Sequence, residues 1–411
     1  MRFQAVALGV LMLTTSVGAQ LPVAPAGRVL PIHEPGTLAE LAEAMREFAA
    51  AAPSAFADFQ RVAPSCKSAE ELVALSTRSA TELADRRRPA VAQVLAGVRP
   101  IAATPAAVQA LAWVAASRAA GLSAEAAGLL KAHHLAHRET VSLAYGSRED
   151  PTLWSEALLK ALRASADVPE DLRPGILEAL AVTKQNQAEA AKALRAMSPS
   201  QVKMWLVGHG PELLASYRGL DIKATEAEAV SLFGQFGESN PLAQYRRSLT
   251  YADFAKSSAF EIRNLQVGQV APDFTGEDFD GAKYRLSESR GKVVAVVFYG
   301  ELGGEPSKTV AHLETLAADM KGLPFQLVAV HSGRDRAKVA DALAGAGATW
   351  RNLWCGAEKS STDIASAWNV HRDATIYFLD AGGVIRVKGL PFGQSLHYEV
   401  KALLAEHAAK K

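Results

Sequence analysis

One short segment of the chain groups three histidines at a spacing that could bind a metal ion. His133, His134 and His137 lie in the segment LLKAHHLAHRE. If this segment is one continuous helix, His133 and His137 are four residues apart on the same face, as in metal-binding helices. A zinc protease of this type has Glu directly after the first histidine, where this chain has His134. A His133 and His137 metal site is therefore an alternative that lacks a catalytic base, and the main prediction is that no metal is bound.

The only two cysteines of the sequence limit its thiol chemistry. Cys66 and Cys355 cannot build a disulfide framework or a Cys-rich zinc site. A single Cys66 to Cys355 bridge would require an oxidising compartment. Cys355 as a nucleophile is an alternative to its simpler interpretation as a small apolar side chain.

The composition excludes other classes of protein. The chain has 411 residues, with 44 Lys and Arg against 43 Asp and Glu, so its net charge is +1. This balance provides no positive field for nucleic acid. Hydrophobic residues make up 49% of the chain, which is enough for packed cores, and the length suits two or three domains. We therefore expect a multidomain globular protein.

The first 19 residues resemble a secretory signal peptide. Arg2 precedes an apolar stretch, and the small residues Val17, Gly18 and Ala19 form a cleavage pattern. Residues 20–36 are rich in Pro and Gly, which predicts a linker. No later segment offers the roughly 18 uninterrupted apolar residues of a membrane span. We expect export, cleavage and a periplasmic or extracellular location, with an uncleaved anchor as the alternative.

Residues 37–263 are predicted to form an all-α domain. Ser68 and Glu71 have capping-box spacing, and three further pairs place an N-cap residue before a proline: Thr104-Pro105, Asp150-Pro151 and Ser198-Pro199. The three prolines recur at nearly equal intervals, which suggests a helical-hairpin repeat. We expect the run from Arg86 to Arg88 to be exposed at the C-terminal end of the first of these helices.

Residues 264–411 are predicted to form an α/β domain. Its apolar runs, at residues 293–299, 325–330, 375–379 and 384–387, alternate with helical stretches at 308–320, 335–344, 361–368 and 395–407. Strands that are apolar throughout indicate a sheet covered on both faces. The segment from Asp380 to Gly383 is a hairpin turn, so the sheet is expected to be mixed.

Short motifs follow one another through the same residues, at Val267 to Phe274, Asp280-Gly281, Leu286-Ser287, Arg290 to Val294, Trp368 to Val370 and Thr375 to Ile385. In this order they resemble a known family, the exported thioredoxin-fold redoxins of the TlpA and AhpC/TSA type. The resemblance implies a thioredoxin-like fold over about the last third of the chain. It also implies that a thiol-disulfide oxidoreductase or peroxiredoxin-like antioxidant activity is the family's usual function.

The residues that would carry this chemistry are replaced. The family has two cysteines after the first strand of the domain, because a thiolate at a helix N-terminus attacks a disulfide and a second thiol resolves the product. Alignment places Gly303 and Pro306 at these positions, and Ser307 at the peroxidatic position. Ala374 stands where the family has a cis-proline. We therefore expect no catalytic residues and no cofactor.

Three functions remain open at this point. The favoured one is an exported, non-catalytic binding or scaffold module that recognises an unidentified protein or peptide partner. The first alternative is an oxidoreductase of the resembling family that uses an unrecognised nucleophile such as Cys355, and the second is the His-based metal-binding protein.

Overall fold

A computed structural model represents the chain. It describes residues 61–62, 69–119, 121–149, 152–197, 199–246, 249–299, 306–331, 336–345, 348–355, 364–370, 375–388 and 395–409. Several predictions concern positions outside these residues: the signal peptide and linker, Cys66 and its bridge, the Ser68 cap, the Asp150-Pro151 pair, Ser198, Gly303 and Ala374. No helix among the described residues is both long and apolar enough to cross a membrane.

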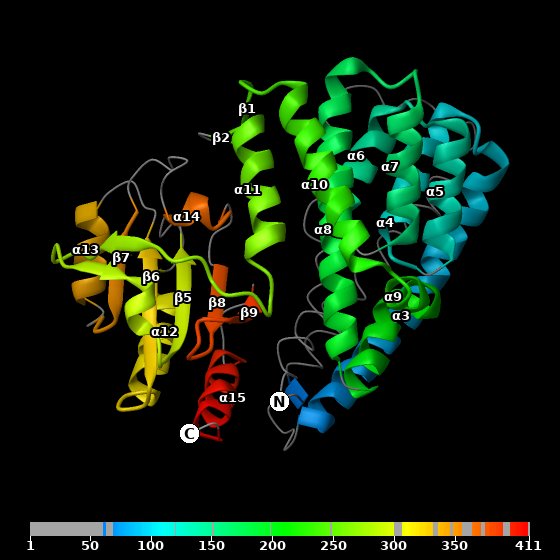
Figure 1. Cartoon of the computed structure of the whole chain (residues 1–411). Coiled ribbons are helices and arrows are strands. Elements are labelled where there is room, and N and C mark those ends of the chain that lie inside the picture. Colours follow the sequence, from blue (N-terminus) through cyan, green and yellow to red (C-terminus); the bar gives the residue numbers. More distant parts are fainter. Residues whose placement is uncertain are drawn as a thin grey trace. The chain divides into compact units, whose positions relative to one another are not determined.

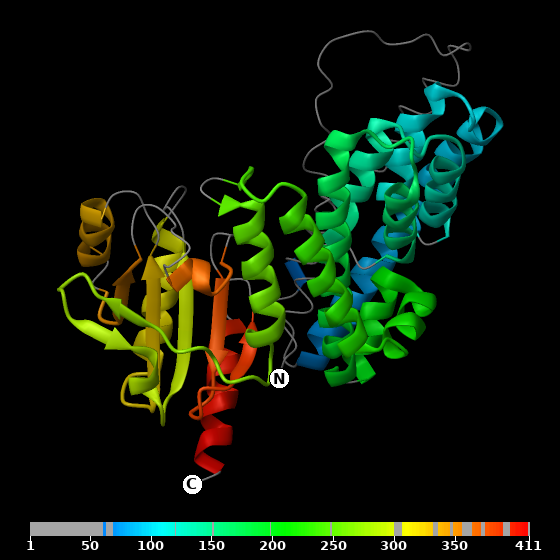
Figure 2. The same cartoon turned by 45° about the horizontal axis from the view of Figure 1, so that its top comes forward.

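The described chain divides into two compact units at Phe233, within helix α10. The first is the helical unit, whose helices lie side by side in Figure 2. Its elements are α3 (Ala69–Val98), α4 (Val108–Ala116), α5 (Leu122–His133), α6 (Arg138–Gly146), α7 (Leu153–Ala164), α8 (Arg173–Ala196), α9 (Pro199–Arg218) and the first part of α10 (Ile222–Ser239). The helical character predicted for residues 37–263 is confirmed where they are described, but the prediction missed a short antiparallel pair of strands within residues 244–250.

Helix α3 is longer than predicted. We expected it to end at Arg86 to Arg88, but it continues through Pro89 to Val98, so these arginines lie within the helix. Val91, Val94 and Leu95 are fully buried after the proline. Burying three such side chains is worth roughly 1.5 to 3 kcal/mol each, which exceeds the cost of about 3 kcal/mol for a proline inside a helix. Arg87 is buried, and this burial lowers the pKa of its guanidinium.

Two of the proline-based helix starts are visible. Thr104 precedes a short 3-10 turn, Pro105–Ala107, which leads into α4, while the Thr104 hydroxyl donates to the carbonyl of Ile101 instead of capping the helix. Helix α9 begins at Pro199 and is interrupted at Gly210, which has a φ of 79° and directly precedes Pro211. A proline at the first helical position costs no hydrogen bond, which explains both starts.

The C-terminal unit begins with the second part of α10 and a small aromatic cluster. Strands β1 (Gln244–Arg246) and β2 (Leu249–Thr250) form an antiparallel pair before α11 (Tyr251–Asn264). Thr250 and Asp253 form a capping box at the start of α11. The ring of Phe236 on α10 stacks on Tyr251 at 4.5 Å between centroids. These contacts attach α11 to the end of α10.

A five-stranded sheet is the centre of this unit (Figure 1). Its order is β7-β6-β5-β8-β9, with β5, β6 and β7 parallel and with β8 and β9 antiparallel to their neighbours. The strands are β5 (Val293–Tyr299), β6 (Phe325–His331), β7 (Arg351–Trp354), β8 (Thr375–Leu379) and β9 (Ile385–Lys388). The mixed sheet of an α/β unit is as predicted. Strand β7 was not predicted, because it is short and carries Arg351 and Asn352 instead of an apolar run.

Helices cover both faces of the sheet. One face packs against α12 (Pro306–Asp319) and α15 (Ser395–Ala409), through side chains such as Leu316 and Val400. The other face packs against α14 (Ile364–Ala367), with Trp368 and, from α11, Phe260. Helix α13 (Arg336–Gly345) lies between β6 and β7 in the sequence. Because β5 alternates Val293, Ala295 and Val297 toward one core and Val294, Val296 and Phe298 toward the other, the run is apolar throughout.

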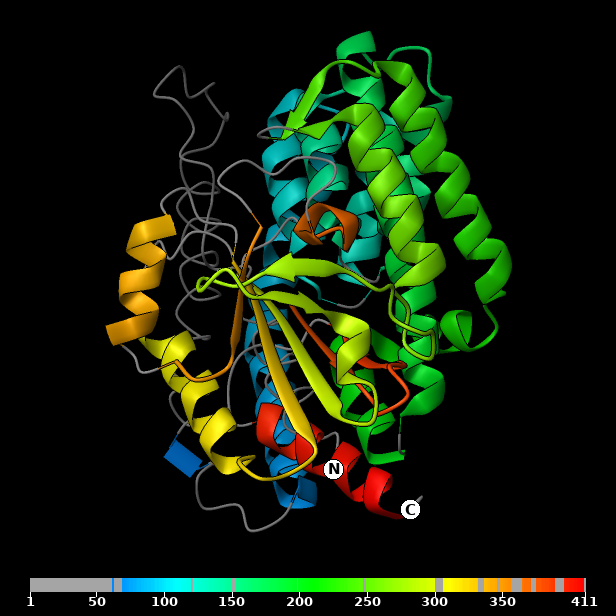
Figure 3. The same ribbon diagram turned by 60° about the vertical axis from the view of Figure 1, so that its left-hand side comes forward.

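Short segments cover both edges of the sheet. Strands β3 (Thr275–Glu277) and β4 (Lys283–Arg285) form a hairpin beside β7, where Asp278 pairs with Leu353 (Figure 3). At the other edge Val270 pairs with Val384, next to β9. Covered edges expose fewer unpaired backbone groups to other chains.

Candidate functional site

The predicted redox positions Gly303 and Ala374 lie outside the described residues, but residues that flank them belong to β5 and β8. Strand β5 ends at Tyr299 and α12 begins at Pro306, so the segment that holds Gly303 connects them. Phe298 pairs with Thr375, the first residue of β8, and Ala374 directly precedes it. The described residues next to the Gly303 segment and next to Ala374 are therefore neighbours near the carboxyl end of β5.

Cys355 lies at the same end of the sheet, where β5 ends. It directly follows β7, and Tyr299, His331 and Trp354 are paired neighbours across β5, β6 and β7. Two strand spacings of about 4.8 Å separate β7 from β5, so the Cys355 backbone is on the order of 10 Å from the end of β5. The sequence alone does not predict this position, because the neighbour relation depends on strand order.

The thiol of Cys355 forms a hydrogen bond with the neighbouring strand β6. Its backbone N–H donates to the carbonyl of His331 at 3.0 Å, and its Sγ donates to the same oxygen at 3.1 Å. The side chain is half-buried and packs against the core beside α14. A carbonyl acceptor favours the protonated thiol over the thiolate, so this environment does not activate Cys355 as a nucleophile.

His331 is a buried imidazole that the sequence analysis did not single out. Asn352 donates through Nδ2 to the carbonyl of Trp350 at 2.8 Å, which turns its Oδ1 toward His331 Nε2 at 3.1 Å. Because this oxygen only accepts, Nε2 carries the proton of the neutral ring. Burial lowers the pKa of His331 to about 4, although the Asn352 hydrogen bond acts in the opposite direction. The one signal in the sequence was a polar residue at the end of an apolar strand.

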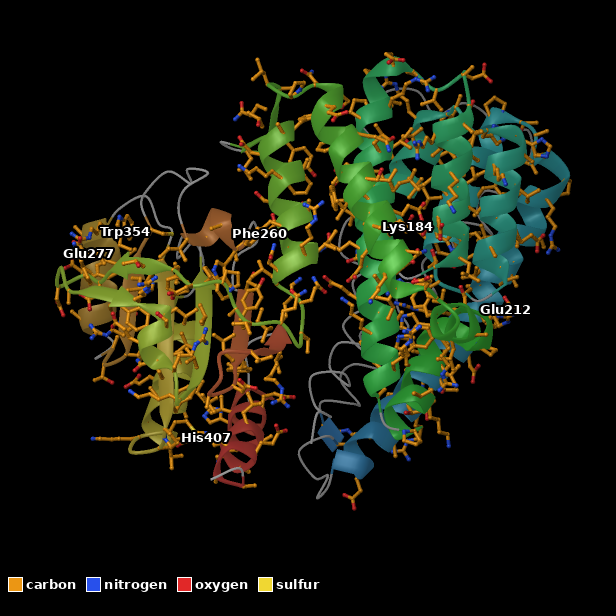
Figure 4. The ribbon with its side chains drawn as sticks, viewed as in Figure 1. Lys184, Glu212, Phe260, Glu277, Trp354 and His407 are labelled. Carbon is orange, nitrogen blue, oxygen red and sulfur yellow. The ribbon has the colours of Figure 1, made fainter. Side chains whose placement is uncertain are left out.

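Aromatic rings lie next to His331 at this end of the sheet. Phe279, from the β3–β4 connection, makes edge contacts with His331 at 5.6 Å and with Trp354 at 5.8 Å between centroids. The guanidinium of Arg336 lies over the Phe279 ring at 5.5 Å. Figure 4 shows Trp354 at the end of β7. Phe279 and Trp354 are half-buried, so part of each ring remains accessible.

The histidine cluster does not have the predicted geometry. Helix α5 ends at His133, and α6 begins at Arg138, so His133 and His137 do not share a helix. His137 is the N-cap of α6, and its Nδ1 accepts from the backbone of Glu139 at 3.2 Å. His134 is buried and donates to the carbonyl of Ala102 at 2.7 Å. The proposed i, i+4 site is therefore wrong, and no group of three or more potential metal ligands occurs among the described residues.

Two residues of the motifs that resemble the redoxin family, Asp273 and Asn369, make hydrogen bonds within the C-terminal unit. Asp273 accepts from Arg285 at 2.7 Å and from the Ser287 backbone at 2.9 Å, and these hydrogen bonds outweigh burial and lower the pKa of its carboxyl group. Asn369 has a φ of 52° and donates to Glu261 of α11, which also accepts from Lys388 of β9. Asparagine tolerates this left-handed conformation better than most residues.

No protein-family model and no curated protein matches the chain. Among solved structures, its C-terminal third is similar to the thioredoxin domain of a thiol-disulfide oxidoreductase from Bacteroides vulgatus, at 24% identity over 34% of this chain and 99% of that one, with a TM-score of 0.31. A thiol:disulfide interchange protein from Bacteroides sp. is 22% identical over 34% of this chain and 91% of that one, with a TM-score of 0.31. A thiol-disulfide oxidoreductase from Bacteroides fragilis is 19% identical over 33% of this chain and 99% of that one, with a TM-score of 0.30. The activity of those proteins is not carried over to this chain.

Proposed function

We propose that this chain is an exported binding or scaffold module whose thioredoxin-like domain does not exchange disulfides. The observation that carries the proposal is the connection from β5 to α12, residues 300–305, which reads GELGGE. Disulfide exchange requires a thiolate, and this connection contains no sulfur. The predicted signal peptide supports export, and the recognised partner is proposed to be a protein or a peptide.

An oxidoreductase based on Cys355 is the second candidate. Strand pairing brings Cys355 to the end of the sheet where β5 ends, which favours this candidate. A single thiol could attack a disulfide and form a mixed disulfide, and an external thiol would then have to release it. The hydrogen bond from Sγ to the His331 carbonyl opposes this candidate, because it stabilises the protonated thiol.

Reduction of insulin and consumption of peroxide by the purified protein test both candidates. We expect the wild-type chain and Cys355→Ser to be equally inactive, while the double variant Gly303→Cys with Pro306→Cys gains thiol-dependent activity. Activity in the wild type that disappears in Cys355→Ser would reject the binding-module proposal. Equal activity in both would reject it as well and would direct attention to Cys66.

A further inference from the structure

The C-terminal unit carries a small group of accessible side chains, which we call the aromatic surface: Phe279, Trp354 and the guanidinium of Arg336. The Phe279 ring contacts both other groups, with its centroid 5.8 Å from that of Trp354 and 5.5 Å from the guanidinium. Both rings are half-buried, and Arg336 is exposed. Trp354 is labelled in Figure 4. Measured contacts therefore join all three groups in one place that solvent reaches.

The two rings are carried by elements that are attached to each other. Backbone pairing of Asp278 with Leu353 joins the hairpin that bears Phe279 to β7, which ends at Trp354. Phe279 also makes an edge contact with the buried ring of His331 at 5.6 Å. Aromatic side chains that are already held in place lose little conformational freedom when a ligand binds. The rings are therefore suited to contact a partner.

Arg336 lies at this surface without an ion pair to a carboxylate of the described residues. Its Nη2 donates to the backbone carbonyls of Asp278 and Phe279, at 3.3 and 3.4 Å. Arg351 of β7, by contrast, pairs with the carboxylate of Asp278 at 2.6 Å. Arg336 is also the first residue of α13, where a cation opposes the helix dipole. Neither an ion pair within the described chain nor the stability of α13 accounts for a cation at this position.

The charges of the neighbouring hairpin do not remove this cation. Three acidic residues lie on the hairpin, namely Glu277, Asp278 and Asp280. Lys283 lies opposite Glu277 in the strand register, and Arg351 pairs with Asp278. Asp280 is exposed at the turn, where its charge is solvated and screened by salt. The charged group that contacts the aromatic surface is Arg336, so this surface favours an anionic partner.

We propose that the aromatic surface binds a peptide segment that carries an acidic residue beside an apolar one. Arginine has five N–H groups, and Nη2 alone serves the hairpin carbonyls, so Nε and Nη1 can donate to the carboxylate. The apolar side chain packs on Phe279 and Trp354. Trp and Arg are among the residues that contribute most to binding at protein interfaces. The inference rests on the proposed binding function and gives the chemical class of its partner.

Selection from a phage library of random short peptides, with the full chain as the target, tests the proposal. We expect the selected peptides to carry Asp or Glu next to an aromatic or aliphatic residue. Arg336→Glu should weaken binding of synthetic copies of these peptides by at least about tenfold, because it places like charges opposite each other. Lys321→Glu is the matched control, since it changes the net charge equally at an exposed position before β6, at the other end of that strand. It should leave binding unchanged.

The peptides that Arg336→Glu itself selects provide a second readout. We expect Lys or Arg in place of the acidic residue, because the variant reverses the charge at the surface. Arg336 is exposed, so Arg336→Glu and the milder Arg336→Gln should keep the thermal midpoint of the wild type.

Three outcomes would overturn the proposal: no selected peptide, equal binding to the wild type and Arg336→Glu, or an equal loss of binding in Lys321→Glu. Peptides that bind independently of Arg336 would still leave the proposed binding function standing. Thiol-dependent reduction of insulin by the wild type would instead reject the proposed function, whichever peptides bind. The two failures are therefore distinguishable.

Discussion

Lys160 and Lys184 bind the same oxygen of Glu156, but their surroundings differ. The Lys160 side chain is 56% exposed and that of Lys184 only 8%. An exposed ion pair is worth about 0 to 1 kcal/mol, whereas removing one partner of a buried pair costs roughly 3 to 5 kcal/mol. We therefore expect Lys184→Met to lower the free energy of unfolding by several times more than Lys160→Met, measured by urea denaturation. Equal losses would show that burial does not separate these two lysines.

A titration of His331 tests how burial affects the protonation of its ring. Its folded-state pKa of about 4 lies below the ordinary value of 6.5, so the unfolded chain binds more protons between these two values. The contribution of His331 to stability is therefore complete above pH 6.5 and is lost as the pH falls from 6.5 toward 4. We expect the imidazole signal of His331 in an NMR titration to move near pH 4, with His331→Gln identifying the signal. A midpoint near 6.5 would mean that the ring is solvated.

At the scale of elements, the β8–β9 hairpin depends on one glycine. Gly383 has a φ of 76°, and a Cβ at this position would overlap the guanidinium of Arg290. Asp380 receives the backbone N–H groups of Gly382 and Val384, each at 3.0 Å, which closes the turn. This arrangement explains why the motif from Asp380 to Gly383 predicted the hairpin correctly.

Gly383→Ala should destabilise the C-terminal unit by at least about 1 to 2 kcal/mol, the cost of a left-handed residue with a Cβ. Gly382→Ala is the matched control, because its Cβ would lie 3.3 Å from Asp380 Oδ1 and its backbone is not left-handed. We expect a clearly smaller loss there, measured by thermal unfolding. Similar losses in both variants would contradict the role assigned to the Gly383 conformation.

At the scale of the whole molecule, the predicted domain boundary and the division into two compact units differ. The predicted boundary lies between residues 263 and 264, whereas the compact units divide at Phe233. Helix α11 lies between these positions, and its Phe260 and Glu261 contact the sheet core, Asn369 and Lys388. Loss of α11 would expose part of that core.

Limited proteolysis of the full chain distinguishes the two boundaries. Leu242, between α10 and α11, is 88% exposed, so we expect the first cuts there and a stable C-terminal fragment that retains α11. Edman sequencing identifies the start of the fragment. A stable fragment that begins between Asn264 and Val270 would instead support the boundary predicted from the sequence. The variant Glu261→Gln loses the ion pair with Lys388, so proteolytic cutting after α11 should increase.

The sequence by itself determined the features that depend on neighbouring residues along the chain. Apolar runs predicted β5, β6, β8 and β9, and the turn from Asp380 to Gly383 predicted the antiparallel pair. These signals are local, since strand burial and turn geometry are encoded within a few residues.

Only the tertiary structure decided the relations between distant segments. Strand order placed Cys355 and His331 at the end of the sheet where β5 ends, and helix packing brought Glu156 and Lys184 together. The end of α5 at His133 was also beyond local reading, because the free energy that continues or ends a helix comes largely from the packing of its apolar face. Such packing joins residues far apart in the chain, and a single sequence carries no local signal for it.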